Sequence, residues 1–280
     1  LKLINKNLNV TNNFSYAKKL DIIIFCLPTP LKKNRPDLSY IKISLQKIKK
    51  YLQKDQLFIL ESTSYPGTTE EEILEPLKKK FKIGKNFYIS FSPERDDPGS
   101  KINTYKVPRI VSGFTNKCKN LSRSLYKNIF KTIVDVETIK IAEMAKIYEN
   151  VYRAVNIGLV NELKKISYKM NIDVHKVIEA AKTKPYGFSA FYPGPGLGGH
   201  CIPIDPFYLS WKAKQHGIKT EFIELSGKIN KSMPNWVVSI LSKNLNKAKF
   251  RNKTKVLVLG VTYKNNINDT RESPGLKIID

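Results

Sequence analysis

Short apolar runs alternate with amphipathic segments over the first half of the chain. The run at 21–27 is almost entirely apolar and ends at Pro28-Thr29-Pro30, which is the pattern of a buried strand followed by a loop. The segment 39–52 instead repeats its apolar residues at helical spacing. Further strands are predicted at 57–60, 86–90 and 109–112, with a helix that Thr68 opens and caps and another at 121–130. Such alternation predicts an α/β fold with a parallel sheet and helices on both faces.

The second half of the chain changes character. From 140 to 170 there is no proline and one glycine, so a single long helix is predicted. Shorter helices are expected at 173–182, 207–215 and 234–246, and the segment 185–206 is a loop dense in glycine and proline. The apolar run 255–260 predicts a buried strand that starts a second α/β unit.

The loops after the predicted strands are the first place to look for a ligand site. In open α/β sheets, ligands bind beyond the carboxyl ends of the strands. Here those loops are 28–30, 62–63, 93–95 and 260–271, and we expect them to line one crevice. No strand is followed by G-x-G-x-x-G, and the glycine-rich stretch 194–199 follows no strand and opens no helix.

Charge and cysteine content narrow the class of protein. The 280 residues carry a formal charge of +25, which raises nucleic-acid binding as an alternative, but only seven residues are arginine. We therefore interpret the excess as a lysine-rich solvated surface and do not expect a nucleic-acid partner. No apolar run approaches the roughly 20 residues of a membrane-spanning helix. Three cysteines without a C-x-x-C pair favour a reducing cytoplasm.

Cys201 is the strongest candidate nucleophile. It follows Gly198-Gly199-His200, where glycines let the backbone approach a ligand and expose amide N–H groups. A thiolate there could attack a carbonyl, and the alternative is a buried structural cysteine. His200 adjoins it, but neighbouring residues in extended chain point apart, which disfavours a cysteine hydrolase. The three histidines are widely separated, and no metal site is predicted.

Lys146 and Asn150 are four residues apart on the predicted long helix and therefore share a face. Together they present two donors to one spot, as an anionic tetrahedral intermediate requires. A solvated helix face is the alternative, but the apolar and small residues around them predict burial. Glu94 and Asp205 are candidate general bases or, alternatively, salt-bridge and cap residues. Lys264 and Arg271 are exposed cations or, together, a site for phosphate or carboxylate.

These segments resemble the UDP-glucose/GDP-mannose dehydrogenases, a family of NAD-dependent nucleotide-sugar 6-dehydrogenases. The resemblance covers nearly the whole chain, and the glycine-rich blocks look most like the branch that acts on UDP-N-acetylhexosamines. It rests on 25–30, 61–69, 91–95, 143–162, 191–206 and 260–274.

The resemblance implies three domains and a homodimer formed through the long helix. They are a partial NAD-binding Rossmann-like domain at 1–134, a central helical dimerisation and catalytic domain at 135–250, and the start of a nucleotide-sugar-binding domain at 251–280. Both ends look cut, and the family's first strands, with their glycine fingerprint, are missing. We expect an internal fragment, for which binding of NAD and turnover are open.

The resemblance also implies a reaction, a double oxidation of the sugar C6 alcohol to a uronate for surface polysaccharide. Cys201 would carry a thiohemiacetal and then a thioester. Lys146 and Asn150 would stabilise the oxyanion, Asp205 would activate water, and Glu94 with Thr63 would order it. Ile204 stands where some members carry a lysine, which would remove one cofactor contact. The implied substrate-binding residues are Arg95, Phe191, Tyr192, Gly194, Gly198 and Lys264, and the implied NAD contacts are Thr29, Thr63 and Arg271.

Two alternatives remain open at this point. The substrate of the same chemistry could be UDP-glucose or GDP-mannose. The chain could also be a non-catalytic fragment whose long helix only mediates dimerisation.

Overall fold

The computed structural model describes residues 8–32, 35–97, 99–199, 202–248 and 254–280. Two compact units can be distinguished. The first takes its residues from Leu1–Lys32, Pro36–Asp96 and Ile102–Lys146, and the second from Lys33–Arg35, Asp97–Lys101 and Ile147–Asp280. Helix α4 (Ile139–Lys169) contributes residues to both.

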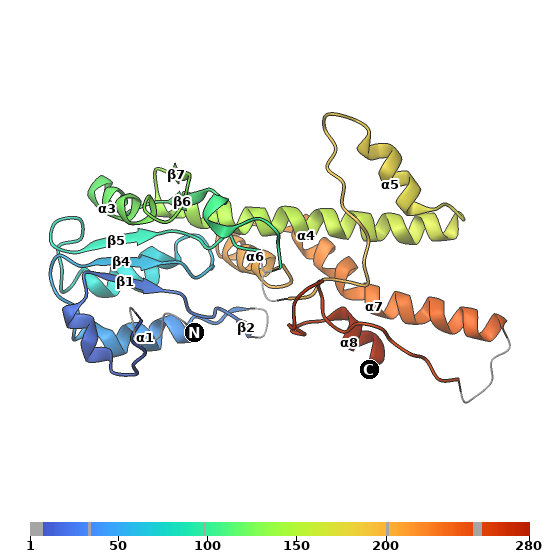
Figure 1. The fold of residues 1–280 in the computed structure, drawn as a ribbon, viewed down its shortest axis with the longest axis horizontal. Coiled ribbons are helices and arrows are strands. Elements are labelled where there is room, and N and C mark those ends of the chain that lie inside the picture. Colours follow the sequence, from blue (N-terminus) through green and yellow to red (C-terminus); the bar gives the residue numbers. More distant parts are fainter. Residues whose placement is uncertain (1–7, 33–34, 98, 200–201, 249–253) are drawn as a thin grey trace. The chain divides into compact units, whose positions relative to one another are not determined.

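A parallel sheet organises the first unit, as the alternating pattern predicts (Figure 1). Its order is β1 (Ile22–Phe25), β4 (Leu57–Leu60), β5 (Tyr88–Phe91), and every residue of β4 and β5 is buried. β6 (Arg109–Val111) pairs in parallel with β7 (Ile133–Asp135). Two short strands, β2 (Leu31–Lys32) and β3 (Arg35–Pro36), also pair with each other.

β1 is less buried than its sequence predicts. Ile23 and Phe25 are buried, but Ile24 is 42% exposed. In the described sheet β1 is an edge strand paired only with β4, and only alternate side chains reach the core.

Helices cover the sheet where the apolar spacing places them. α1 (Ser39–Lys49) buries Ile41, Leu45 and Ile48. α3 (Asn116–Tyr126) begins earlier than predicted, because the Thr115 side chain accepts the N–H of Cys118 and caps the helix there. The first unit also contains the 3-10 helices η1 (Phe14–Lys19) and η3 (Thr104–Lys106), the π-helix η2 (Thr69–Leu74) and α2 (Glu75–Leu77).

The predicted cap at Thr68 is wrong. Its hydroxyl donates to Tyr65 O at 2.7 Å and lies 3.0 Å from the Ser64 hydroxyl, and no side-chain cap bond is formed. The free N–H groups of this turn are taken by Glu143 of α4, which accepts from Gly67 N at 2.6 Å and Thr69 N at 2.8 Å. A carboxylate distant in sequence therefore replaces the local cap.

The second unit is helical. α5 (Val174–Lys182) forms where a short helix was predicted. Asp173 caps it, and its Val174 and Ile178 pack with Val160 of α4. α6 (Asp205–Gln215), α7 (Glu221–Lys247) and α8 (Pro274–Ile279) follow. α7 was expected to begin at Pro234, but it runs through this proline. The buried Ser226, Asn230 and Met233 show that packing on this face overrides the local cost of proline.

The segment 255–260 is not the buried strand that its sequence predicts. Leu257 is 82% exposed and Leu259 is 85% exposed, and within the described residues no strand pairs with them. A strand requires ladder partners for its N–H and C=O groups, and an apolar run alone cannot supply them. Nowhere in the described ranges is a helix both long enough and apolar enough to cross a bilayer.

Candidate active site

Two carboxylates converge on one arginine at the carboxyl edge of the sheet in the first unit. The Arg109 guanidinium, 2% exposed, lies 2.7 Å from Glu61 Oε1 and 2.8 Å from Glu94 Oε2. Glu61 directly follows β4, and Glu94 lies in the loop after β5. The loops at 61–63 and 93–95 therefore meet at the edge where ligands of such sheets bind.

Arg109 is fixed on its other sides as well. Its Nε donates to Ser92 Oγ at 2.7 Å, and a terminal nitrogen donates to Ser92 O at 3.1 Å. The guanidinium lies 4.7 Å from the ring centre of Tyr126 and 5.1 Å from that of Phe130. The Tyr126 hydroxyl donates to Glu61. The geometry is that of a rigid, charge-paired support rather than a mobile surface cation.

Glu94 is held as a carboxylate. Burial alone would raise its pKa, but the Arg109 charge and hydrogen bond, with N–H donors from Asp96 and Arg95, hold the pKa below its ordinary value. Its side chain is still 48% exposed and so remains accessible. Glu94 thus suits accepting a proton or orienting water. The neighbouring Arg95 side chain donates to Pro108 O at 2.6 Å.

The loops after β1 and β4 are hydrogen-bonded to each other. The Thr29 hydroxyl donates to Thr63 O at 2.7 Å, and Leu27 N donates to Ser62 Oγ at 2.7 Å. Thr29 is buried, and Thr63 is partly exposed. Cys26, beside them, is unsuited to nucleophilic chemistry. Burial, and then the Glu61 carboxylate 3.4 Å from its sulfur, raise its pKa to about 12.

A further acidic side chain, Glu143 of α4, binds the turn that follows β4. Glu143 is 1% exposed, and burial raises its pKa from 4.5 to about 7, although the donors from Gly67 and Thr69 oppose the shift. A carboxyl whose folded-state pKa is raised stabilises the fold fully below its unfolded pKa, and that contribution is lost as pH rises through the folded pKa.

We therefore expect the first unit to lose about 3 kcal/mol of stability between roughly pH 4.5 and pH 7 through Glu143. Glu143→Gln should flatten this dependence, because glutamine does not titrate. Hydrogen exchange of the β4 and β5 amides across this pH range measures it. Glu75→Gln, at a side chain 52% exposed, is the control and should leave the slope unchanged. An unaltered slope in Glu143→Gln would contradict the assignment.

The second site cluster lies on α4. Lys146 and Asn150 are one turn apart, and both are buried as predicted, at 9% and 5% exposure. Asn150 Nδ2 donates to Asp205 Oδ2 at 2.5 Å, and Asp205, the first residue of α6, is 4% exposed. The Lys146 ammonium makes no hydrogen bond or ion pair with another residue that the structure describes. Cys201 and His200 lie outside the described residues.

The glycine-rich loop of the second unit is anchored at several points. The Phe191 ring packs edge-on against Tyr152 at 5.7 Å, and the Tyr192 hydroxyl donates to Glu179 at 2.6 Å. Gly194 N donates to Asn161 Oδ1 at 2.9 Å. A Cβ on Gly198 would stand 2.2 Å from Tyr263 Cβ, so only glycine fits there.

Lys264 and Arg271, the two candidate anion-binding residues, each form an ion pair with an aspartate. Lys264 Nζ lies 2.7 Å from Asp97, and Arg271 lies 2.7 Å from Asp269. An anionic ligand at either would have to compete with a carboxylate.

Sequence reasoning missed Arg109, Glu61 and Asn161. Arg109 did carry a signal, because an arginine that opens an apolar strand must find partners once it is buried. Asn161 carried a weaker one, an asparagine on the apolar face of a long helix.

Comparison with protein families identifies two regions. Residues 2–131 match the NAD binding domain of the UDP-glucose/GDP-mannose dehydrogenase family, and residues 140–232 match the central domain of the same family. The two matches together take in well over half of the chain.

Curated proteins similar to the chain include Protein CapL of Staphylococcus aureus, which is 39% identical over 100% of this chain and 67% of its own length. A UDP-N-acetyl-D-mannosamine dehydrogenase of Methanocaldococcus jannaschii is 37% identical over 94% of the chain and 59% of its length. A UDP-N-acetyl-D-glucosamine 6-dehydrogenase of Pseudomonas aeruginosa is 37% identical, with 98% and 65% covered. The chain thus spans 59 to 67% of these relatives.

Solved structures agree with the fold. The UDP-D-ManNAc dehydrogenase of Pyrococcus horikoshii superposes with a TM-score of 0.88 at 34% identity, covering 96% of this chain and 64% of that one. The UDP-N-acetyl-mannosamine dehydrogenase Cap5O of S. aureus gives a TM-score of 0.79 at 36% identity, with 92% and 61% covered. The Rossmann-like α/β class predicted from the sequence is confirmed.

Proposed function

Because the chain belongs to the UDP-glucose/GDP-mannose dehydrogenase family, we propose that it forms part of an enzyme that oxidises C6 of a UDP-sugar to the carboxylate. A UDP-N-acetylhexosamine is the proposed substrate. Two relatives of the chain, one named for UDP-N-acetylmannosamine and one for UDP-N-acetylglucosamine, are each 37% identical to the chain. The observation that carries the proposal is the buried donor set on α4. Asn150 is bound to Asp205, and Lys146, one turn away, has no partner among the described residues.

The residues at the sheet edge fit the NAD that this family uses. The loops after β1 and β4 are joined by hydrogen bonds at this edge. Thr29 and Thr63, one from each loop, would hold the cofactor there. When bound, NAD supplies the acceptor for the hydride removed in each oxidation. Arg271 stays a proposed further contact, now seen paired with Asp269.

For the donor pair on α4, the proposed chemistry is covalent capture. The Cys201 thiolate adds to the C6 aldehyde, a C–S bond forms, and negative charge develops on the former carbonyl oxygen. The Asn150 amide and the Lys146 ammonium supply hydrogen bonds and charge to that oxygen. After the second oxidation, water attacks the thioester carbon, the C–S bond breaks, and the carboxylate leaves.

Asp205 is the proposed acceptor of the water proton. Its carboxylate is buried at the start of α6, and the Asn150 amide fixes its orientation. Proton transfer by such a positioned group contributes about 10² to 10⁴ in rate. In the first unit, Glu94 and Thr63 are proposed to orient water, and the lowered pKa of Glu94 supports a role as acceptor rather than as acid. Arg95, Phe191, Tyr192, Gly194, Gly198 and Lys264 are proposed substrate contacts.

The test is a substrate panel on the complete gene product that contains this chain. UDP-N-acetylmannosamine and UDP-N-acetylglucosamine should each be assayed beside UDP-glucose and GDP-mannose. The expected result is two NADH per sugar consumed and a uronate product with an N-acetylated sugar. No NADH formation with any of the four would overturn the proposal. Preference for UDP-glucose or GDP-mannose would overturn only the choice of sugar.

We also propose a homodimer formed along α4. In the second unit α4 exposes a row of apolar side chains at spacings of four and seven residues. Tyr148 and Leu159 are each 63% exposed, and Tyr152 and Ile166 are 43% and 49% exposed. A heptad-like apolar stripe suits packing against another helix. The product is proposed to serve surface polysaccharide, and the cysteine usage supports a cytoplasmic location.

Leu159→Glu is expected to convert the dimer into monomers, because it places a charge in the centre of this stripe. Light scattering coupled to size exclusion measures the mass. Arg153→Gln, on another face of the same helix, should remain dimeric. A wild-type chain that is monomeric at all concentrations would contradict the proposed interface.

A further inference from the structure

Two buried asparagines link the glycine-rich loop to α4 and α7. Asn161 on α4 is 0% exposed and Asn230 on α7 is 3% exposed. Gly194 N donates to Asn161 Oδ1 at 2.9 Å, and Asn161 Nδ2 donates to Asn230 Oδ1 at 2.9 Å. Asn230 Nδ2 then donates to Ala154 O, back on α4, at 3.0 Å. The result is one continuous line of three hydrogen bonds, which runs from the loop through both asparagines to the Ala154 carbonyl.

The direction of this line is fixed by its two ends. Gly194 N–H can only donate, and Ala154 C=O can only accept. Each asparagine must therefore turn its oxygen toward the loop side and its nitrogen toward the Ala154 side. Reversing either amide would place two acceptors or two donors face to face. In a buried site such a mismatch costs the full desolvation of the unpaired groups.

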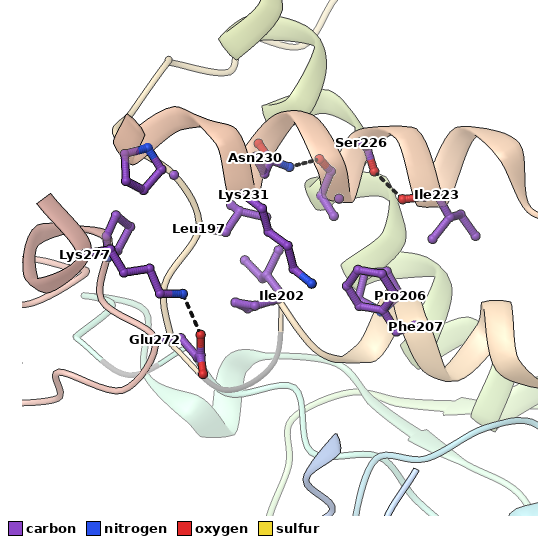
Figure 2. A pocket seen from close by; sticks show the side chains of 16 residues that line it. Leu197, Ile202, Pro206, Phe207, Ile223, Ser226, Asn230, Lys231, Glu272 and Lys277 are labelled. Carbon is purple, nitrogen blue, oxygen red and sulfur yellow. Dashed lines mark hydrogen bonds and ion pairs between the residues drawn. The ribbon is translucent and has the colours of Figure 1, made fainter. Parts of the chain in front are cut away.

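The backbone packs closely around these three hydrogen bonds. A Cβ on Gly158 would lie 3.0 Å from Ser226 Cβ, so α4 and α7 cross tightly beside the asparagines. Gly196 has φ +137°, and a Cβ there would lie 3.2 Å from Asn230 O. Asn230 lines a cavity of about 50 Å³. Figure 2 shows it there together with Leu197 and Ile202, two apolar side chains of the loop. Loop, α4 and α7 are thus held as one piece.

We infer that Asn161 and Asn230 are positioning residues for the sugar-binding loop. They hold the backbone of Gly194, a proposed substrate contact, in register with α4. Asn150 sits on the same helix, eleven residues before Asn161. The three hydrogen bonds therefore fix the position of the loop relative to Asn150, the proposed donor to the reacting group. This inference rests on the proposed function, and it adds two residues that need not touch the substrate.

Asn161→Asp and Asn230→Asp test the inference, because each keeps shape and removes one donor. In Asn161→Asp a carboxylate oxygen faces Asn230 Oδ1, and in Asn230→Asp one faces Ala154 O. Loosening the loop should raise KM for the UDP-sugar about tenfold, as the loss of roughly 1.4 kcal/mol implies. The KM for NAD should stay within about twofold, and kcat should change less than the sugar KM.

Asn230→Asp provides a signature that a purely structural role would not give. A protonated aspartate can donate to Ala154 O and restore the line. The sugar KM of this variant should therefore fall toward the wild-type value as pH is lowered from 8 to 5, relative to wild type at each pH. Asn156→Asp is the matched control on α4, since Asn156 Nδ2 donates to Tyr152 O on its own helix, at 2.8 Å, and to no other residue in the described ranges.

Hydrogen exchange of the loop amides at 190–196 separates failure of the inference from failure of the proposed function. The expected result is faster exchange in both variants and not in Asn156→Asp. Faster exchange together with an inactive wild-type enzyme would uphold the loop anchoring but defeat its catalytic purpose. Variants with wild-type sugar KM and wild-type exchange would overturn the inference, whatever the substrate.

Discussion

Replacing Cys201 by serine in the complete gene product is expected to stop uronate formation. The thiolate is the nucleophile in cysteine chemistry, and a serine hydroxyl is not ionised near neutral pH unless a base activates it. The aldehyde would then escape capture, and the second oxidation would lack its covalent substrate. We expect the rate of uronate formation to fall by at least about 10³-fold, which chromatography of the product measures.

Replacing either of the two proposed oxyanion donors, Lys146 and Asn150, should also lower the rate. Lys146→Met removes a buried ammonium that has no partner among the described residues, and Asn150→Leu removes the amide bound to Asp205. Each should lower kcat by about 10² to 10³, the usual loss for one oxyanion donor. When either substitution is combined with Cys201→Ser, the further fall in kcat should be much smaller. The effects of residues that stabilise the same intermediate are not additive.

Cys26→Ser is the control. Cys26 follows β1 and keeps its thiol protonated, since burial and the Glu61 carboxylate raise its pKa to about 12. We expect full activity from this variant. Two-step turnover in Cys201→Ser at the wild-type rate would remove Cys201 as the nucleophile and leave the family assignment untouched.

Elements set by local pattern were predictable from the sequence. β4 spans Leu57–Leu60 as expected, and α4 at Ile139–Lys169 lies within one residue of its predicted ends. Both depend on continuous apolar runs or helical spacing that nearby residues reveal. The segment 255–260 has the same kind of pattern and is still not a strand, since in the described part of the chain no ladder partner accompanies it.

In the candidate site, the sequence predicted the pair on one helix and the place of Glu94 after a strand, but not the partners of these residues. Spacing alone put Lys146 and Asn150 on one face. The partner of Asn150 is Asp205, 55 residues away, and the cap of the turn at Thr69 is Glu143, 74 residues away. Such pairs arise from tertiary folding, which residue type and spacing do not encode. The cluster around Arg109, built from three strand ends, was missed for the same reason.

Arg109→Met is expected to lower the stability of the first unit by about 3 to 5 kcal/mol, the cost of breaking a buried ion pair from one side. Glu61, 12% exposed at its side chain, would be left as a mostly buried carboxylate without its cation. Arg123→Met is the control, because Arg123 pairs with Asp135 at a surface where the side chains are 52% and 37% exposed. That change should cost at most about 1 kcal/mol.

The measurement must resolve the two units. Trp211 and Trp236 both belong to the second unit, so tryptophan fluorescence reports that unit alone. Hydrogen exchange of the β4 and β5 amides under increasing urea reports the first unit. We expect the exchange midpoint to fall in Arg109→Met while the fluorescence midpoint stays at its wild-type value.

A double variant decides between charge and packing as the cause. If the unpaired carboxylate is responsible, Glu61→Leu added to Arg109→Met should recover most of the lost stability, because no buried charge remains. If lost contact with Tyr126 and Phe130 is responsible, the double variant should be no more stable than Arg109→Met alone. The second result would show that Arg109 supports the sheet edge as a packed side chain, and would remove the electrostatic account of Glu94 as a fixed acceptor.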